Sequence, residues 1–482
     1  MSVRSGWWIG TLMIAIAMAT ETAGAQRDGG WVGRDVVASA RPFVLIDGPR
    51  EIRVREFAEY RVLRAVGVQL LLGGDGGRAI GWTTPDQVVP VERMREVFTQ
   101  RIQADPGDVF AYCMRAKSLM YANQANAALV DLARAGRLDP EEPMVLVFRG
   151  EAFLIQLKLD AAIVECNRAL RLDPDLPEAH ELRGVVRLHK RDTDGALDDI
   201  SRAILLTPEV GRLYLNRGEA WLHKENDAHA ILDFTEAIRL HPTPRAHTDR
   251  ALGWYRRGKL DLALDDCARA LRLDPACAEA YRLRASIEWE RGRVAAAMID
   301  LSESIRIDPT QAEARESRGR ILLDLGRYEE AMVEFEAALR GDPGRPMSHL
   351  GRGTVLESRR DYAGALDEYA EAARLAPGEA IAHNSLAWIR ATCPEARFRD
   401  GALAVAEATR ACELSRWKGA EFLDTLAASC AEAGGFEAAA KWISDAIAIS
   451  TDSTAKARYQ AHQKLFRSGA AYRDTVPEFE SP

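Results

Sequence analysis

The sequence predicts a mainly α-helical protein, a right-handed α-solenoid of about ten helix–turn–helix units preceded by a small all-β barrel domain. Three observations lead to this prediction. Prolines recur every 34 residues over most of the chain, small residues recur at fixed places within each period, and the residues before Pro90 form short apolar runs separated by glycine. A 34-residue period fits a helix–turn–helix unit, and such units stack because none buries its apolar face alone.

The proline period sets a register that other residues share. The interval is 34 residues each time except once, when it is 33, and the prolines run from Pro106 to Pro377. If the proline is called position 32, position 20 is alanine in eight successive units, and position 27 is alanine in seven of them, with Ser304 as the exception. Position 8 is also small, which lets the two helices of a unit touch. Position 8 is occupied by Ala116, Gly150, Gly184, Gly218, Ala251, Ala285, Gly319 and Gly353.

With these marks the chain resembles the tetratricopeptide repeat family from residue 91 to about 470. The resemblance implies a solenoid over residues 109–453, whose last two units, beginning near Asn384 and Leu423, have drifted from the pattern. We expect a lead-in helix at 91–108 that seats the solenoid on the β-domain. A capping helix is expected at 454–472, because terminal units need a polar outer face. The tail at 473–482 is expected to be disordered.

The resemblance also implies where partners bind. In this family the concave face is lined by positions 2, 5, 6, 9, 12 and 13 of the first helix of each unit. Later units carry charges there, such as Glu279, Arg282 and Asp324, but the first two units are apolar. Such a patch is rarely left in water, so either a partner segment fills it or the β-domain or the lead-in helix covers it. The candidate groove consists of Phe110, Met114, Met120, Tyr121, Met144, Val147, Phe148, Leu154 and Ile155.

A second regular feature is a ladder of arginines. Position 7 is arginine and position 23 is acidic in the same eight units. The two helices of a unit run antiparallel about a turn near positions 15 and 16, so both positions lie equally far from the turn and side by side. We expect an ion pair within each unit, rather than a binding site for an extended anion. The expected structural ion pairs are Arg115–Asp131, Arg149–Glu165, Arg183–Asp199, Arg217–Asp233, Arg250–Asp266, Arg284–Asp300, Arg318–Glu334 and Arg352–Glu368.

Residues 26–90 predict the β-domain. Residues 43–46 indicate a strand that ends in a turn at 47–48, and residues 60–72 alternate partly between apolar and polar, with a break at Gly67. The glycines at 73–77 indicate another turn. Over residues 81–89 the segment resembles the closing strands of Src-homology-3-like barrels, and this resemblance implies a fold but no ligand.

The N-terminus has the order of a secretion signal. Arg4 supplies the positive charge, residues 7–19 are apolar, and Ala23-Gly24-Ala25 forms a small-x-small cleavage site. We expect residues 1–25 to be removed and the protein to be periplasmic or secreted, with an uncleaved anchor as the alternative. No later stretch is apolar for 18 residues, so no transmembrane span is expected in the mature chain.

Composition and motifs argue against several functional classes. The net charge of -8 argues against a nucleic-acid partner. We find no glycine-rich phosphate loop, no His-Glu-x-x-His and no Gly-x-Ser-x-Gly, so we expect neither catalytic residues nor a cofactor. Seven cysteines without a CxxC give no simple metal or redox motif, and their odd number leaves at least one unpaired. His180, His349 and His383 share position 4, where we expect ring packing rather than metal binding.

Together these observations predict an exported scaffold or adaptor, not an enzyme, that binds a protein or peptide segment on its concave face. The alternative is an envelope-structure protein, in which the β-domain contacts cell-wall polymer and the solenoid serves as a spacer. The two differ in whether cell-wall sacculi or proteins are recovered with the chain.

Overall fold

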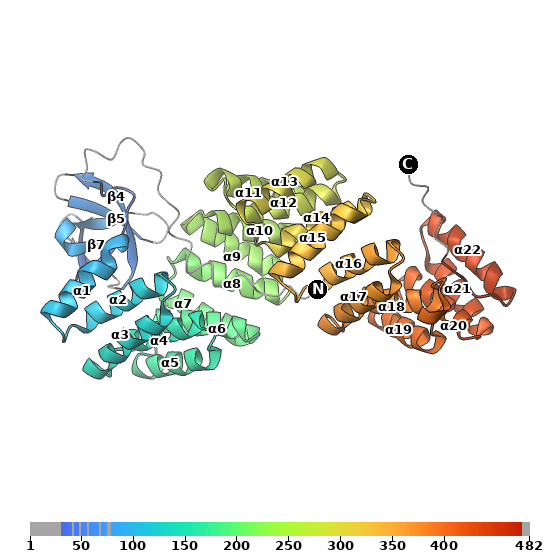
Figure 1. Cartoon of the computed structure of the whole chain (residues 1–482). Coiled ribbons are helices and arrows are strands. Elements are labelled where there is room, and N and C mark those ends of the chain that lie inside the picture. Colours follow the sequence, from blue (N-terminus) through green and yellow to red (C-terminus); the bar gives the residue numbers. More distant parts are fainter. Residues whose placement is uncertain are drawn as a thin grey trace. The chain divides into compact units, whose positions relative to one another are not determined.

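The computed structural model describes residues 30–40, 43–47, 50–54, 57–66, 69–74 and 79–474. The expected signal at 1–25, most of the expected turn at 73–77 and the expected tail from residue 475 lie outside the described residues. The chain forms two compact units, one that ends at Pro275 and one that begins at Ala276. Figure 1 shows the helices and strands coloured along the chain. Over the described residues the fold class is confirmed, because helices in repeated pairs form a solenoid behind an antiparallel β half-barrel.

The half-barrel opens the N-terminal unit. Its seven described strands are all antiparallel and lie in the order β3-β2-β6-β5-β4-β1-β7. The expected alternating stretch at 60–72 consists of two strands, β4 and β5, which pair with each other. The strands are β1 Asp35–Ala38, β2 Val44–Asp47, β3 Arg50–Arg53, β4 Glu59–Val66, β5 Gln69–Gly73, β6 Ala79–Thr83 and β7 Val88–Pro90.

Helix α1, Met94–Ala104, connects the half-barrel to the solenoid. Its residues Met94, Phe98 and Ile102 are buried at the spacing of one helix face. The Phe98 ring lies edge-on to Phe110, with the ring centroids 5.9 Å apart. Arg101, on the same helix, donates to the backbone oxygen of Ser39 in the half-barrel and pairs with Asp108 at 2.5 Å. The lead-in helix therefore contacts both parts of the N-terminal unit.

The solenoid of the N-terminal unit consists of five helix pairs. Pro143, Pro177 and Pro244 stand in the first turn of their helices, where the missing N–H costs nothing. The helices are α2 Val109–Tyr121, α3 Ala125–Leu138, α4 Pro143–Ile155, α5 Leu159–Leu172, α6 Pro177–His189, α7 Thr193–Leu206, α8 Gly211–His223, α9 Asp227–Leu240, α10 Pro244–Arg256 and α11 Leu260–Leu273.

The C-terminal unit continues the same pattern with five more pairs and a final helix. The turn that follows Thr392 contains a short 3-10 helix, Ala396–Phe398. The helices are α12 Ala278–Glu290, α13 Val294–Ile307, α14 Ala312–Asp324, α15 Tyr328–Gly341, α16 Pro346–Ser358, α17 Tyr362–Leu375, α18 Ala380–Thr392, α19 Gly401–Leu414, α20 Ala420–Glu432, α21 Phe436–Ile449 and α22 Ser453–Arg467.

In the units with Gly218 and Gly353, position 8 is small because an aromatic side chain at position 24 lies against it. A Cβ atom added to Gly218 would come within 2.5 Å of the Phe234 ring, and one added to Gly353 within 2.5 Å of the Tyr369 ring. Such contacts are closer than packed atoms tolerate. Glycine at position 8 therefore lets an aromatic ring fill the space between the paired helices.

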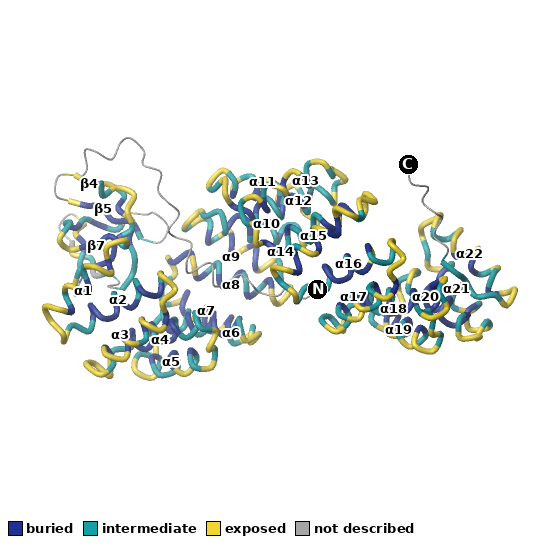
Figure 2. The backbone as a smooth tube through the Cα atoms, in the orientation of Figure 1, coloured by how far each residue is buried: buried dark blue, intermediate teal, exposed yellow. Residues whose placement is uncertain are grey.

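The turn between paired helices places position 15 in the left-handed region in all eight regular units. Three units use Gly258, Gly292 and Gly326, with φ from 68° to 73°. The other five use residues that bear a Cβ atom, which disfavours this conformation. These are Asn123, Leu157, Arg191, Glu225 and Arg360, with φ from 56° to 63°. Figure 2 shows exposed residues gathered at such turns.

Candidate functional site

The arginine ladder is directed into the units. Each position-7 guanidinium contacts the position-23 carboxylate of its own unit, with seven distances of 2.5–2.8 Å and a close contact between Arg352 and Glu368. The arginine side chains are 15–30% exposed and the carboxylates 3–14%. Each positive charge therefore has a buried partner.

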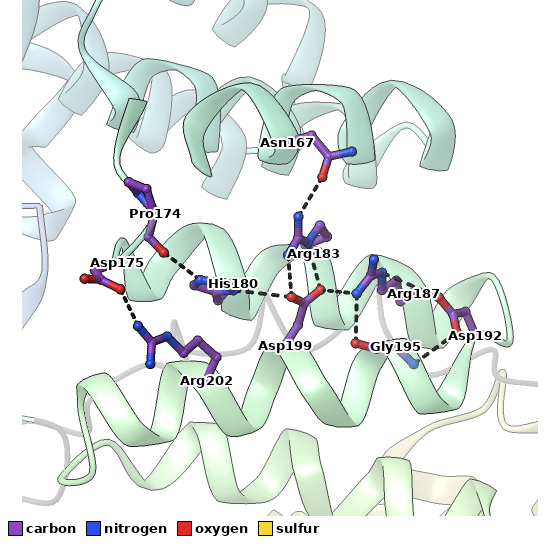
Figure 3. A network of polar contacts seen from close by, with 10 residues as sticks. All are labelled: Asn167, Pro174, Asp175, His180, Arg183, Arg187, Asp192, Gly195, Asp199 and Arg202. Atoms are coloured by element: carbon purple, nitrogen blue, oxygen red, sulfur yellow. Dashed lines mark hydrogen bonds and ion pairs between the residues drawn. The ribbon is translucent and has the colours of Figure 1, made fainter. Parts of the chain in front are cut away.

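Asp199 shows how densely such a carboxylate is bonded (Figure 3). Arg183 donates to both of its oxygens, at 2.8 and 2.6 Å, in the fork geometry that guanidinium groups favour. Arg187 donates to Oδ2 at 2.7 Å, and the His180 ring lies 3.3 Å from Oδ1. The hydrogen bond to Asp199 raises the pKa of Arg183 above its ordinary value.

The same arginines also connect neighbouring units. Where position 25 of the preceding unit is Asn, Ser or Thr, the remaining Nη1 atom donates to that side chain. Arg183 reaches Asn167 at 2.7 Å (Figure 3), and Arg217 reaches Ser201 at 3.3 Å. These bonds use most of the donors of the guanidinium, which has five. The ladder therefore stabilises the stack and offers little to an external anion.

Histidines at position 4 are part of this network, which sequence reasoning missed. We expected ring packing for His180 and His349, but each ring also bonds the position-23 carboxylate, as does His247 to Asp266 at 3.0 Å. The bond to Glu368 raises the pKa of His349, although burial opposes the rise. The sequence contained a signal for this contact, because histidine recurs at position 4 of units whose position 23 is acidic. The sharing of one carboxylate by two side chains was not evident from spacing.

The apolar candidate groove is covered by the half-barrel. The Phe57 ring, just before β4, packs against Phe110 at 5.1 Å and against Phe148 at 5.5 Å between ring centroids. Of the nine candidate residues, six are buried: Phe110, Met114, Met120, Met144, Val147 and Phe148. The other three are partly buried: Tyr121, Leu154 and Ile155. In this structure these side chains form an internal interface rather than an open site for a partner.

Polar contacts fix the same interface at its margin. Lys117, at position 9 of the first unit, donates from Nζ to the backbone oxygen of Phe57 at 2.9 Å and lies 3.1 Å from Oε1 of Glu59. The hydroxyl of Tyr121 also donates to Glu59. An aromatic side chain just before β4 and an acidic side chain at its first residue are thus bound on the concave face, the first by rings and the second by a lysine and a tyrosine.

Beyond the covered part, the concave face is polar and dense in ion pairs. In the N-terminal unit Glu181 pairs with Arg212 at 2.6 Å and accepts a bond from Asn216 at 3.2 Å. In the C-terminal unit Arg345 lies 2.6 Å from Glu313 and 3.0 Å from Glu316. Such a surface offers charges and hydrogen-bonding groups more than apolar area.

In the C-terminal unit, the last helix pairs bind a segment of the same chain on this face. We expected residues from 473 onward to be disordered, but Arg473 and Asp474 make defined contacts. Asp474 accepts a bond from Trp388 Nε1 at 2.9 Å, and Arg473 pairs with Glu432 at 2.6 Å. No periodic pattern marks this segment, because it lies outside the repeats.

The described residues show neither a reactive thiol arrangement nor a metal site. All seven cysteines are buried and none forms a disulfide, and burial raises the pKa of Cys166 and of Cys412 to about 12, which disfavours the nucleophilic thiolate. No group of three metal-ligating side chains occurs within the described part of the chain. Among the described helices, none combines the length and the apolar character needed to cross a membrane.

Comparison with protein families matches the tetratricopeptide repeat to residues 113–177, 181–244, 248–312, 308–346 and 316–380. A comparison with curated proteins finds no match. Solved structures similar to this chain include a tetratricopeptide repeat protein from Parabacteroides merdae ATCC 43184, with 20% identity and a TM-score of 0.44, covering 54% of this chain and 98% of that one. The human IFIT1 dimer with PPP-AAAA has 14% identity and a TM-score of 0.45, covering 75% and 95%. The APC/C hetero-tetramer Cut9-Hcn1 has 13% identity and a TM-score of 0.48, covering 77% and 87%.

Stacked helix pairs with inward-directed ion pairs and a polar concave face define an α-solenoid suited to contact with other chains. The chain belongs to the tetratricopeptide repeat family, whose repeat matches more than half of it. Proteins of this family are generally non-catalytic scaffolds for protein–protein interaction, and this fold supports the same general role. The solved structures share too little identity to indicate a particular partner.

Proposed function

We propose that the protein is an exported scaffold that binds segments of other proteins on the concave face of its solenoid. The observation that carries this proposal is the seating of the segment at Phe57 and Glu59 on that face. A segment from outside the repeats is bound there by ring contacts and by a lysine that donates to its backbone oxygen and pairs with its carboxylate. These are the kinds of contact with which solenoids of helix pairs recognise peptides.

Export is proposed from the N-terminal order of Arg4, an apolar run at 7–19 and Ala23-Gly24-Ala25. Sequencing the N-terminus of exported material tests this point. A mature chain that starts at Gln26 supports export, and a cytosolic chain that starts at Met1 contradicts it.

We propose that the partner site is the open part of the concave face, because the first units are covered. Glu290, Arg320 and Asp324 are exposed charged residues at concave positions of the C-terminal unit. Opposite charges on a partner would be steered to such a surface, and mutation of these charges should weaken binding.

The experiment compares two charge reversals in the full mature chain. Asp324→Lys changes the concave face, and Glu336→Lys makes the same change on an exposed position of a second helix. Each variant is mixed with envelope proteins and with cell-wall sacculi. We expect recovery of a protein partner that Asp324→Lys weakens and Glu336→Lys does not. Recovery of sacculi instead, unaffected by both variants, would support the envelope-structure alternative and overturn the scaffold proposal.

A further inference from the structure

The chain folds its own C-terminal segment back onto the last units. Helix α22 ends at Arg467, and Gly469, with φ of +74°, reverses the chain direction. The next residues have no regular secondary structure. Asp474 is fixed twice, because its side chain accepts a bond from Trp388 Nε1 at 2.9 Å and its backbone N–H donates to the oxygen of Thr392 at 2.9 Å.

The two preceding residues have receptors of their own. The Tyr472 ring lies 5.8 Å from Trp388 and 4.3 Å from His462, measured between ring centroids. Arg473 pairs with Glu432 at 2.6 Å, and Arg399 holds the other oxygen of that carboxylate at 3.0 Å. Three successive residues, aromatic, basic and acidic, are thus each recognised by a matching group.

These receptors stand where the family binds partners. Trp388 and Thr392 occupy positions 9 and 13 of the ninth unit, and Glu432 occupies position 13 of the tenth. Glu357, at position 12 of the eighth unit, lines a small cavity together with Asp474. The segment therefore covers concave positions of α16, α18 and α20, which places it where a partner segment would lie.

The C-terminal segment also makes one unfavourable contact, between two carboxyl groups. The cavity that contains Glu357 and Asp474 also contains Tyr362 and Cys393, and the Tyr369 hydroxyl donates to Glu357 at 2.7 Å. Burial raises the pKa of Glu357 to about 7, a hydrogen bond from Tyr369 opposes the rise, and the charge of Asp474 adds to it. Two carboxyl groups that share a cavity disfavour full ionisation of both. A short segment held against such repulsion can be exchanged for a competing one.

We propose that the concave face of α16, α18 and α20 is a recognition site for protein segments with an aromatic, a basic and an acidic residue in succession, and that residues 472–474 occupy it as an intramolecular ligand that such a segment displaces. This inference rests on the proposed scaffold function and names the chemistry of a partner. A segment that binds this site must supply an aromatic ring that packs on Trp388, a cation that pairs with Glu432 and a carboxylate that accepts from the indole N–H of Trp388.

The test uses a fluorescent synthetic peptide of residues 468–482 as the probe. It is titrated into the full chain and into the full chain carrying Tyr472→Ser and Asp474→Asn. A tethered ligand has an effective concentration of about millimolar, so it competes strongly with an added peptide. We expect the variant chain to bind the peptide at least about 100-fold more tightly than the wild-type chain, in line with the gain that tethering gives. Equal affinities, or no binding to the variant chain, would overturn the proposal.

A matched pair of substitutions locates the binding. In the same variant chain, Trp388→Phe removes the indole donor to Asp474, and we expect the affinity for the peptide to fall about tenfold, the cost of one hydrogen bond to a charged group. Trp442→Phe makes the same change at a tryptophan that stacks on Trp417 instead, and the affinity should not change. An equal loss in both, or in neither, would show that the peptide binds elsewhere. The wild-type chain could instead form a dimer in which the C-terminal segment of each copy binds the site of the other copy. That result would also overturn the proposal that a different protein displaces the segment.

The outcome separates this inference from the proposed function. Because the probe is the chain's own segment, the titration does not depend on finding a partner. Peptide binding at Trp388 without any envelope partner would contradict the scaffold function alone. Partner binding through Asp324 without peptide binding at Trp388 would contradict this site alone.

Discussion

At the scale of single residues, the interior of each unit is organised around one carboxylate. The position-23 acid accepts bonds from the arginine at position 7 and, in several units, from a histidine at position 4. In Asp266, burial raises the pKa, but the bonds from His247 and Arg250 together outweigh it and the net pKa is lowered. Buried charges of this kind stabilise a fold only while all partners remain.

The first prediction concerns the pair Arg217 and Asp233. Arg217→Ala leaves a carboxylate that is 9% exposed without its main partner, so we expect a loss of about 1–3 kcal/mol, between the values for exposed and buried pairs. The double variant with Asp233→Ala should lose less than the sum of the single variants. Thermal unfolding of the four chains gives the coupling energy. Strict additivity would contradict the pairing.

The second prediction uses the pH dependence of His349. Its folded pKa is raised, mainly by the bond to Glu368, so its contribution to stability is complete below the ordinary histidine pKa and is lost as pH rises through the folded value. His349→Gln should therefore lower the melting temperature more at pH 5.5 than at pH 8.5. Arg352 faces the same site and remains charged throughout. His241→Gln, at an exposed histidine, serves as the control with no such difference.

Much of this network could be predicted, because position 7 and position 23 recur at a constant separation. The polar residues at position 25, such as Asn167, could not. Alanine occupies this position in three of the eight regular units, and the bond from the polar residues to the next unit depends on how units stack. Contacts within one repeat follow from the helix period, whereas contacts between repeats need the stacking geometry.

At the scale of elements, the helix pairs follow from small residues at position 8 and from turns at position 15. The glycine register was visible in the sequence. The left-handed conformation at position 15 was less evident, because only three of the eight regular units have glycine there. The remaining side chains adopt this conformation because the packed helix pair imposes it.

The third prediction follows from this turn. Leu157 has φ of 58° and a side chain that is 58% exposed, so Leu157→Gly removes backbone strain and few contacts. We expect a gain of about 0.5–1 kcal/mol, the cost of a left-handed residue less the entropy of glycine. Gly258→Ala is the converse control, because its added Cβ atom meets nothing within 4 Å and only the backbone is strained. Denaturant unfolding should show opposite signs for the two.

The fourth prediction concerns the seat of the half-barrel. Phe148→Asp places a carboxylate against Phe57 in a buried position, which is costly without a partner. We expect the half-barrel to detach and the junction near Pro90 to be cleaved at least about tenfold faster by a protease, since a loss of about 1.4 kcal/mol in local stability has that effect. Phe148→Leu keeps the site apolar and should change cleavage little. An unchanged rate in Phe148→Asp would contradict the interface.

At the scale of the whole chain, the concave face is the surface on which segments from outside the repeats are bound. Phe57 and Glu59 are bound within the N-terminal unit, and Tyr472 to Asp474 within the C-terminal unit. The sequence indicated an apolar patch and left open what covers it. Neither segment belongs to the periodic pattern, so the identity of the two occupants could not be read from the repeats.

The central claim, that the open concave face receives a partner, is tested most directly by site-specific crosslinking in the native envelope. A photoreactive residue is placed at Asp324 on the concave face or at Glu336 on an exposed position of a second helix. The account predicts a discrete protein adduct from Asp324, and none of that mass from Glu336. The same adduct from both positions, or an adduct from Glu336 alone, would contradict it.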